Sequence, residues 1–228
     1  MKKLLNFFTK TELFLWLSSV LVITASYLIS GAGDSLTILT SVFGVTAVIL
    51  VAKGYVAGQM LSIVFALLYA AISLKYHYYG EMLTYLFMSM PVALAAVISW
   101  LKHPYKNSMQ VEVGDLNFKK VVTLCVITII VTIVFFFILK YLGTANLIVS
   151  TISVATSFAA AYLSVLRSPY YAVIYSLNDI VLIVLWILAS IDSISYLPMV
   201  FCFLMFLAND IYGFYNWNKM RKKQKESI

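Results

Sequence analysis

The feature that most constrains this fold is a series of eight apolar runs, each long enough to cross a lipid bilayer as a helix. A helix rises about 1.5 Å per residue, so roughly 17 to 25 residues span the hydrocarbon core. The runs cover residues 12–30, 36–52, 56–76, 82–101, 120–142, 146–166, 169–190 and 194–218. We therefore predict an all-α integral membrane protein with eight transmembrane helices.

The composition supports a membrane protein. The chain is 63% hydrophobic and 11% charged, whereas a soluble domain is nearer half apolar and a quarter charged. The first apolar run follows Lys2, Lys3 and Lys10 and lacks a small-x-small cleavage site. We therefore expect this run to be a span and not a cleaved signal peptide.

The basic residues are distributed unevenly between the two sides of the membrane. With eight spans both termini lie on one side, and that side receives fourteen of the sixteen Lys and Arg residues. Only Lys75 and Lys140 fall on the other side. Cytoplasmic loops carry such an excess, so we expect both termini in the cytoplasm. We interpret the net charge of +7 as a topology signal and a contact for lipid headgroups, with no nucleic-acid partner.

Two triplets of spans resemble each other, over residues 36–101 and 146–219. Each triplet begins with a run rich in small residues and closes with a Trp-x-Lys sequence. Residues 102–143 supply a cytoplasmic loop and a linker helix between them, residues 1–35 an amino-terminal segment and span, and residues 220–228 a basic cytoplasmic tail. A single linker helix gives both triplets the same orientation. We therefore predict a 3+1+3 parallel repeat after the first helix, an arrangement that some transporters use.

Two Asn-Asp pairs lie inside apolar runs, Asn178-Asp179 and Asn209-Asp210. Polar and ionisable groups at membrane depth are costly, so they need a partner or a ligand. We interpret these pairs as the centre of a substrate site. The alternative is structural, with the carboxyl groups bonded to Asn or Tyr side chains only to hold helices together.

Neighbours at helical spacing extend this candidate site. Tyr175 and Trp186 share a helix face with Asp179, and Tyr212 shares a face with Asn209. Aromatic faces stack on flat rings and attract organic cations, and Asn amides bind ribose hydroxyls or carboxamides. For Trp186 an anchor position in the membrane interface is the alternative.

Four further residues receive an interpretation of their own. Gln59, in the first triplet, is a candidate wall residue, with an ordinary interhelical hydrogen bond as the alternative. Trp100 and Trp217 are predicted to be interface anchors, and Glu81 is predicted to be a solvated loop charge. Neither histidine and neither cysteine has companion ligands in the sequence, so we expect no metal site and no disulfide.

Enzyme motifs are absent from the sequence. It contains no Gly-x-Ser-x-Gly, no His-Glu-x-x-His, no glycine-rich phosphate loop and no Cys-x-x-Cys. We therefore expect a protein that is not an enzyme. Two alternatives stay open: an intramembrane enzyme that uses Asp179 and Asp210 as an acid/base pair, and a carrier in which one of these carboxyl groups moves a proton.

Several short motifs, in this order, resemble the PnuC family of bacterial vitamin transporters over about residues 36–219. They are the Tyr79-Gly80-Glu81 turn, the Trp-bearing span entered through Asn178, and Asn209-Asp-x-Tyr212-Gly213-x-x-x-Trp217. The resemblance implies an architecture like that of SWEET transporters, a homotrimer and a place in the bacterial inner membrane. It implies no cofactor.

The resemblance also implies a function. We expect uptake of nicotinamide riboside by facilitated diffusion with alternating access, with thiamine, riboflavin or deoxynucleosides as alternative substrates. Trp186 would stack on the substrate ring, Asn178 and Asn209 would bind the ribose or the carboxamide, and Asp179 or Asp210 would lie near the cationic ring. The candidate substrate-binding residues are Gln59, Tyr175, Asn178, Asp179, Trp186, Asn209, Asp210 and Tyr212.

Overall fold

The computed structural model describes residues 7–31, 35–75, 79–106, 108–144 and 146–227, so Lys2 and Lys3 lie outside the described residues. The helices, in chain order, are α2 (Lys10–Ser30), α3 (Ser35–Ala52), α4 (Val56–Lys75), α5 (Tyr79–Thr84), the π-helical turn η1 (Tyr85–Ser89), α6 (Met90–Leu101), α7 (Phe118–Tyr141), α8 (Leu147–Val165), α9 (Tyr170–Asp192), the short 3-10 helix η2 (Ile194–Tyr196) and α10 (Leu197–Glu226). The predicted runs and the observed helices agree within a few residues at most ends.

Within the described residues, seven helical stretches are long and apolar enough to cross a membrane. They are α2, α4, the stretch from α5 to α6, α7, α8, α9 and α10. An eighth apolar helix, Leu36–Ala52 of α3, is slightly shorter. The prediction of an all-helical membrane protein is confirmed.

Local sequence signals set several helix ends. Thr9 caps α2, because its hydroxyl accepts a hydrogen bond from the Glu12 N–H while the Glu12 carboxylate accepts one from the Thr9 N–H. Pro198 lies in the first turn of α10, where the missing N–H has no intrahelical partner to lose. Gly54, with a φ of +71°, makes the left-handed turn between α3 and α4, a conformation that glycine adopts readily.

The fourth span is not a continuous α-helix, which the apolar pattern did not predict. The chain passes from α5 through the wider turn η1 into α6. Pro91 lies in the first turn of α6, and a proline has no N–H to donate to the preceding turn. Such π-helical turns are frequent at functional sites, and this one presents Tyr85 and Ser89 to a central cavity.

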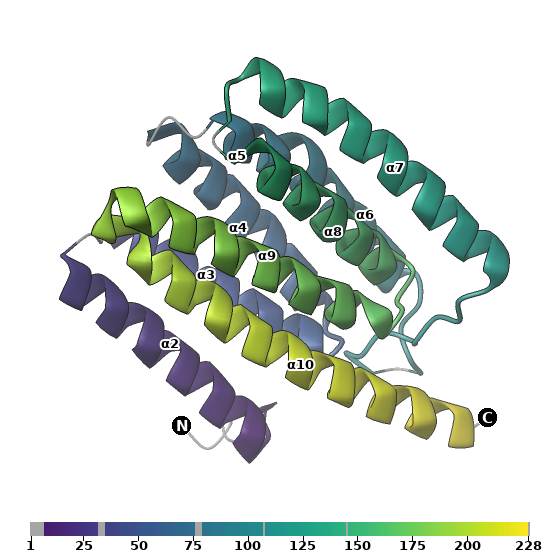
Figure 1. Ribbon diagram of the computed structural model, residues 1–228. Helices are drawn as coiled ribbons and strands as arrows, with labels where there is room; N and C mark the ends of the chain where they lie inside the picture. The colour runs from purple at the N-terminus through teal and green to yellow at the C-terminus, as the bar shows by residue number, and fades with distance from the viewer. Residues whose placement is uncertain (1–6, 32–34, 76–78, 107, 145, 228) are drawn as a thin grey trace.

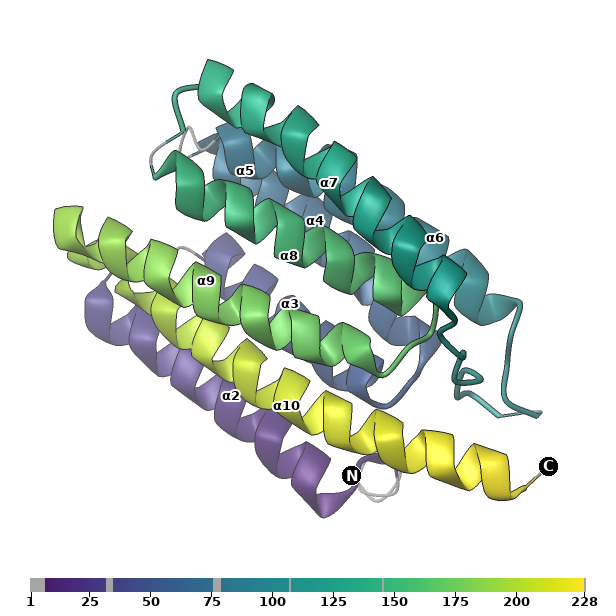
Figure 2. The same cartoon turned by 45° about the vertical axis from the view of Figure 1, so that its right-hand side comes forward.

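The helices lie side by side, with α2 and α7 at opposite edges of the bundle (Figure 1; Figure 2). In the first half of the chain α3 packs against α4 and α4 against α6, and in the second half α9 packs against α8 and α10. The halves meet where α10 contacts α3 and where α6 contacts α8. The amino-terminal helix α2 packs against α3 and α10. Both views show that α2 begins and α10 ends at the same end of the bundle.

The last turns of α10 hold the loop between α6 and α7. The predicted tail is a continuation of the helix, which runs to Glu226. The side chain of Gln224 donates to the carbonyl of Val111 at 3.1 Å and accepts from the N–H of Val113 at 2.8 Å. One amide thus satisfies two backbone groups of an irregular loop, which fixes the loop against the helix.

The prediction that Trp100 and Trp217 are interface anchors is wrong. Both side chains are fully buried and their rings lie 5.4 Å apart. The Trp100 indole donates to the carbonyl of Ser164 and the Trp217 indole to that of Val51, at 2.8 and 2.9 Å. Both carbonyls lie in the last turn of a helix, where intrahelical donors run out. A Trp near the end of a span therefore joins helix ends as readily as it faces headgroups.

Candidate substrate-binding site

A cavity of about 140 Å³ lies where the two halves of the chain meet. Its walls come from α3, α4, η1 and α6 on one side and from α8, α9 and α10 on the other. Five of the predicted site residues line it, Gln59, Tyr175, Asn178, Asp179 and Asp210. The structure thus brings together residues from both predicted triplets around one central cavity.

Two carboxyl groups meet in this cavity. Asp179 of α9 and Asp210 of α10 lie within hydrogen-bonding reach of each other, and their side chains are buried. Ionised carboxylates only accept hydrogen bonds, so a bond between the two requires a proton on one of them. The Oδ2 atom of Asp179 has no hydrogen-bond partner among the described residues. The pair therefore offers an acceptor that a cation, a proton or a ligand N–H can occupy.

The amide of Asn178 is held by its oxygen alone. That oxygen accepts hydrogen bonds from the hydroxyls of Thr156 at 2.8 Å and Ser153 at 3.3 Å, both from α8. Its NH₂ group donates to none of the described residues. Because both donors are on α8, the amide orientation is fixed and its N–H groups remain for a ligand acceptor.

Gln59 combines the two roles that the sequence left open. Its amide nitrogen donates to the hydroxyl of Ser164 at 2.7 Å, which ties α4 of the first half to α8 of the second. The same side chain lines the central cavity. The interhelical hydrogen bond is therefore present, and it also positions the amide at the cavity wall.

Aromatic rings form much of the remaining wall, and most of them were not predicted. Phe65, Tyr85 and Phe206 line the cavity with Tyr175, and Phe65 is 6.0 Å from both Tyr85 and Phe206. Their apolar rings do not stand out from the other aromatic residues of the apolar runs in the sequence. Gly44 allows two of these rings to approach α3 closely, since a Cβ there would lie 2.8 Å from both Phe65 and Phe206. The sequence alone did not reveal this role of Gly44.

Tyr171 is a further wall residue that sequence reasoning did not include among the candidates. It lies one turn before Tyr175, and the two rings meet edge to face at 6.1 Å. Its hydroxyl is buried and has no partner among the described residues. Its helical spacing from Asn178 and Tyr175 is the signal that identifies it.

Asn209 and Tyr212 lie elsewhere. The Asn209 amide donates to the hydroxyl of Ser19 at 3.0 Å and to the carbonyl of Met205, and the Tyr212 hydroxyl donates to Glu12 at 3.0 Å. The helix face that carries Asn209 and Tyr212 is turned towards α2. Asp210, the residue after Asn209, lines the central cavity. Helical spacing predicts that Asn209 and Tyr212 share one face of the helix, but it does not predict which neighbouring helix that face contacts. A contact of these two residues with substrate stays a prediction.

Trp186 lines a second cavity of about 330 Å³, which we term the outer cavity. This cavity lies towards the start of α3, α5 and α10 and the end of α9, at the end of the bundle away from the end of α10. Trp186 is buried and its ring lies 5.8 Å from Tyr196. The structure therefore does not bring Trp186 to Asn178 and the carboxyl pair.

The prediction that Glu81 is a solvated loop charge is also wrong. Glu81 belongs to the first turn of α5, is half-buried and lines the outer cavity. The predicted span begins at residue 82, whereas the helix begins at Tyr79. Those three added residues place the carboxylate inside the protein.

Comparison with known proteins identifies the family. The family model described as nicotinamide mononucleotide transporter matches residues 34–219. The chain belongs to this transporter family. The predicted resemblance to PnuC is confirmed, and α2 lies outside the matched region. The chain is a multi-pass membrane protein, and the prediction that it is not an enzyme agrees with its membership of a family of transporters.

Two relatives of this transporter add detail. A curated protein of Neisseria mucosa, the nicotinamide riboside transporter PnuC, is 26% identical over 139 residues, which are 59% of this chain and 53% of that protein. The match thus spans about half of the curated relative's length. A solved crystal structure, that of the vitamin B3 transporter PnuC, has a TM-score of 0.77 and 24% identity and covers 95% of this chain and 94% of its own. This likeness establishes that the folds are the same.

Proposed function

We propose that this transporter takes up nicotinamide riboside and binds it in the central cavity. The observation that carries the proposal is the buried Asp179–Asp210 pair in a cavity with aromatic walls. The pyridinium ring of nicotinamide riboside is flat and positively charged. Aromatic faces and carboxylates both attract such a ring, and they do so more strongly where water is excluded.

The same cavity favours the riboside over the mononucleotide that the family description names. A phosphate monoester carries about 1.5 to 2 negative charges at neutral pH. Neither cavity has a Lys or Arg among its described lining residues, and the central one has two carboxyl groups. A phosphate would find no counter-charge there, so we expect it to be rejected.

Charge also ranks the alternative substrates. Thiamine carries a cationic thiazolium ring and therefore suits the carboxyl pair, as nicotinamide riboside does. Riboflavin and deoxynucleosides are uncharged and would leave the pair without a cation. The carboxamide and ribose of nicotinamide riboside can form hydrogen bonds with the amides of Asn178 and Gln59. Thiamine has neither a carboxamide nor a ribose, so it would form fewer of these bonds.

Transport follows from the position of the cavity between the two halves of the chain. We propose that α3–α6 and α8–α10 form the two units of a parallel repeat that rock about the substrate, giving alternating access and facilitated diffusion. The termini would be cytoplasmic, in a bacterial inner membrane. The homotrimer and the SWEET-like architecture rest on the family resemblance. A contact of Trp186, Asn209 or Tyr212 with the substrate would belong to another stage of this cycle.

The carboxyl pair supports a second candidate, proton-coupled transport. Two carboxyl groups that share a hydrogen bond hold at least one proton, and a carrier that exchanged this proton with each side would couple substrate to proton movement. In proteoliposomes an imposed pH gradient would then concentrate nicotinamide riboside above equilibrium. A facilitated-diffusion carrier stops at equal concentrations, which is the result we expect.

Ligand-dependent thermal stabilisation of the detergent-purified protein tests the substrate. A ligand that binds only the native state adds about 2.7 kcal/mol of stability at a hundredfold excess over Kd. We expect nicotinamide riboside to stabilise the protein and the mononucleotide to have no effect at the same concentration. Selective stabilisation by thiamine, riboflavin or a deoxynucleoside would identify that compound as the substrate in place of nicotinamide riboside. No effect of any of them on folded protein would contradict a vitamin carrier.

A further inference from the structure

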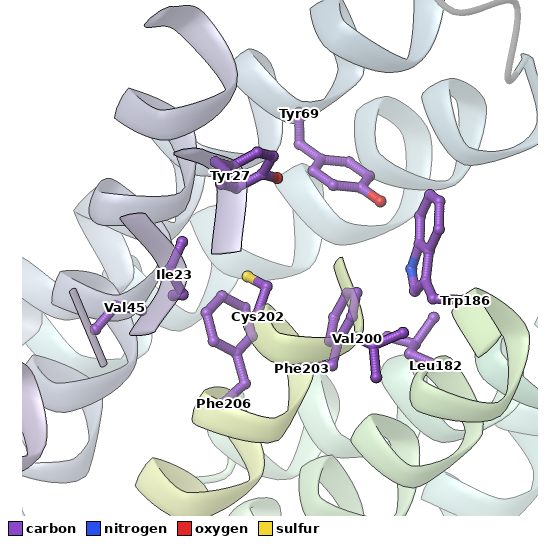
Figure 3. Packing of buried hydrophobic residues seen from close by; sticks show 10 residues of the cluster. All are labelled: Ile23, Tyr27, Val45, Tyr69, Leu182, Trp186, Val200, Cys202, Phe203 and Phe206. Atoms are coloured by element: carbon purple, nitrogen blue, oxygen red, sulfur yellow. The ribbon is translucent and has the colours of Figure 1, made fainter. Parts of the chain in front are cut away.

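The outer cavity has the chemistry of a binding site in its own right. At about 330 Å³ it is larger than the central cavity. Three aromatic side chains, Tyr27, Tyr69 and Trp186, surround one space in it, and Phe203 lies at its base (Figure 3). Rings arranged in this way attract organic cations through their faces.

Glu81 adds a carboxyl group to this aromatic cavity. Its carboxylate forms no hydrogen bond and no ion pair with any residue of the described ranges. No lysine, arginine or histidine is among the described residues that line the outer cavity. A half-buried carboxylate with no partner among the described residues is costly inside a membrane protein, and a cationic ligand in the cavity would offset that cost.

The position of Glu81 is set by close backbone packing. Gly80 lies against the end of α7, since a Cβ there would be 2.7 Å from Leu139 and 2.8 Å from Thr144. Thr84, one turn further on, donates its hydroxyl hydrogen to the carbonyl of Gly80 at 2.9 Å. The first turn of α5 therefore packs directly against the end of α7, which places the carboxylate of Glu81 at the cavity wall.

Two phenyl rings separate the outer cavity from the central one. Phe65 and Phe203 are the only side chains among the described lining residues that belong to both cavities. Phe206 packs edge to face against each of them, at 6.0 and 5.6 Å. Both shared residues contribute a phenyl side chain, which can change rotamer without movement of the backbone.

We propose that the outer cavity is a second binding site, at which Glu81 and the faces of Tyr69 and Trp186 capture an organic cation before it passes Phe65 and Phe203 into the central cavity. This inference rests on the proposed function, since it takes the transported substrate to be cationic. Acidic clefts with walls of low dielectric constant raise the local concentration of cations and their association rates by factors of ten or more. The outer site therefore acts on the rate of exchange and leaves the affinity of the central site unchanged.

Glu81→Gln tests this role, with Glu226→Gln as the matched control. Glu226 is exposed in the last turn of α10, at the opposite end of the bundle. Two quantities are measured for nicotinamide riboside: the Kd of purified protein, and the initial rate of counterflow in proteoliposomes at concentrations well below Kd. We expect Glu81→Gln to keep the wild-type Kd within about twofold and to lose about tenfold in rate, while Glu226→Gln keeps both.

The possible outcomes separate the inference from the proposed function. A wild-type protein that binds no nicotinamide riboside contradicts the proposed function. A wild-type protein that binds it, with an unchanged counterflow rate in Glu81→Gln, overturns the outer site alone. Trp186→Leu provides a second arm if Glu81→Gln does not fold, because it removes an aromatic face and keeps the carboxylate. The same loss of rate at constant Kd is expected there, and a wild-type rate overturns the inference.

Discussion

The ammonium group of Lys53 lies 2.6 Å from the carboxylate of Glu12, although 41 positions separate the two residues in the sequence. Both side chains are buried. The same carboxylate accepts hydrogen bonds from the N–H of Thr9 and the hydroxyl of Tyr212. A single carboxylate therefore ties the start of α2 to the end of α3 and to α10.

Removal of this carboxylate is expected to destabilise the protein strongly. Glu12→Ala would leave a buried ammonium group without a counter-charge, which typically costs about 3 to 5 kcal/mol. Replacement of both partners, in Glu12→Gln with Lys53→Met, removes the unpaired charge and should restore part of that loss. Unfolding of the purified protein in detergent, followed by its intrinsic fluorescence, measures both effects.

An exposed ion pair in the same protein provides the control. Lys225 and Asp115 approach to 3.7 Å, but their side chains are 65% and 80% exposed. Exposed pairs contribute roughly 0 to 1 kcal/mol, so Asp115→Ala should change the stability little. Equal losses in Glu12→Ala and Asp115→Ala would show that burial does not strengthen the pair at α2.

Asn178→Ala should abolish most substrate binding without unfolding the protein. The substitution removes the amide donor that faces the central cavity, and the Thr156 hydroxyl keeps a second acceptor in the carbonyl of Ile152. Loss of one such buried hydrogen bond costs about 1 to 3 kcal/mol, which corresponds to a Kd weaker by roughly 5-fold to 160-fold. Titration of nicotinamide riboside by calorimetry measures the change.

Asn218→Ala is the matched control for this substitution. Asn218 lies on α10, donates to the carbonyl of Phe214 at 2.8 Å and lines neither cavity. Its removal should leave the Kd unchanged. A wild-type Kd in folded Asn178→Ala would place the substrate outside the central cavity.

The fold was largely predictable because run length and composition alone decide whether a helix can cross a bilayer. What escaped prediction depends on contacts between distant segments. The turn η1 differs from its surroundings by hydrogen-bond geometry and not by hydropathy. The last turns of α10 are polar in sequence, and Gln224 there binds the loop at Val111 and Val113.

Part of the site was predictable because polar residues are rare and costly in the middle of a membrane span. Asn178, Asp179 and Asp210 stand out in apolar runs, and the structure brings them to one cavity. Helical spacing also grouped Asn209 with Tyr212 correctly, but the direction of a stripe depends on how its helix is rotated in the bundle. That rotation depends on the packing of α10 against α9, α3 and α2 together, which no local pattern encodes.

Asp179→Asn should reduce the preference for charged substrate. The substitution keeps the size of the side chain and replaces the carboxyl group whose Oδ2 atom has no partner among the described residues with a neutral amide, so binding of the pyridinium form of nicotinamide riboside weakens about tenfold or more. The reduced riboside has an uncharged dihydropyridine ring of nearly the same shape, and its affinity should change much less. Competition binding with both forms measures the ratio. An equal loss for both would mean that Asp179 acts through packing or through a hydrogen bond and not through its charge.

Gly44→Ala should narrow the central cavity while the protein still folds. The added Cβ would lie 2.8 Å from the ring atoms of both Phe65 and Phe206. These atoms belong to side-chain rings, so we expect the rings to move while the backbone keeps its position. Both rings line the central cavity, and Phe65 also lines the outer cavity. Overpacking of this kind costs about 1 to 3 kcal/mol. The displaced rings would occupy space that the ligand needs. We therefore expect Gly44→Ala mainly to weaken the binding of nicotinamide riboside and to lower the thermal stability only slightly. Unchanged affinity in Gly44→Ala would mean that Phe65 and Phe206 do not bound the space that the substrate occupies.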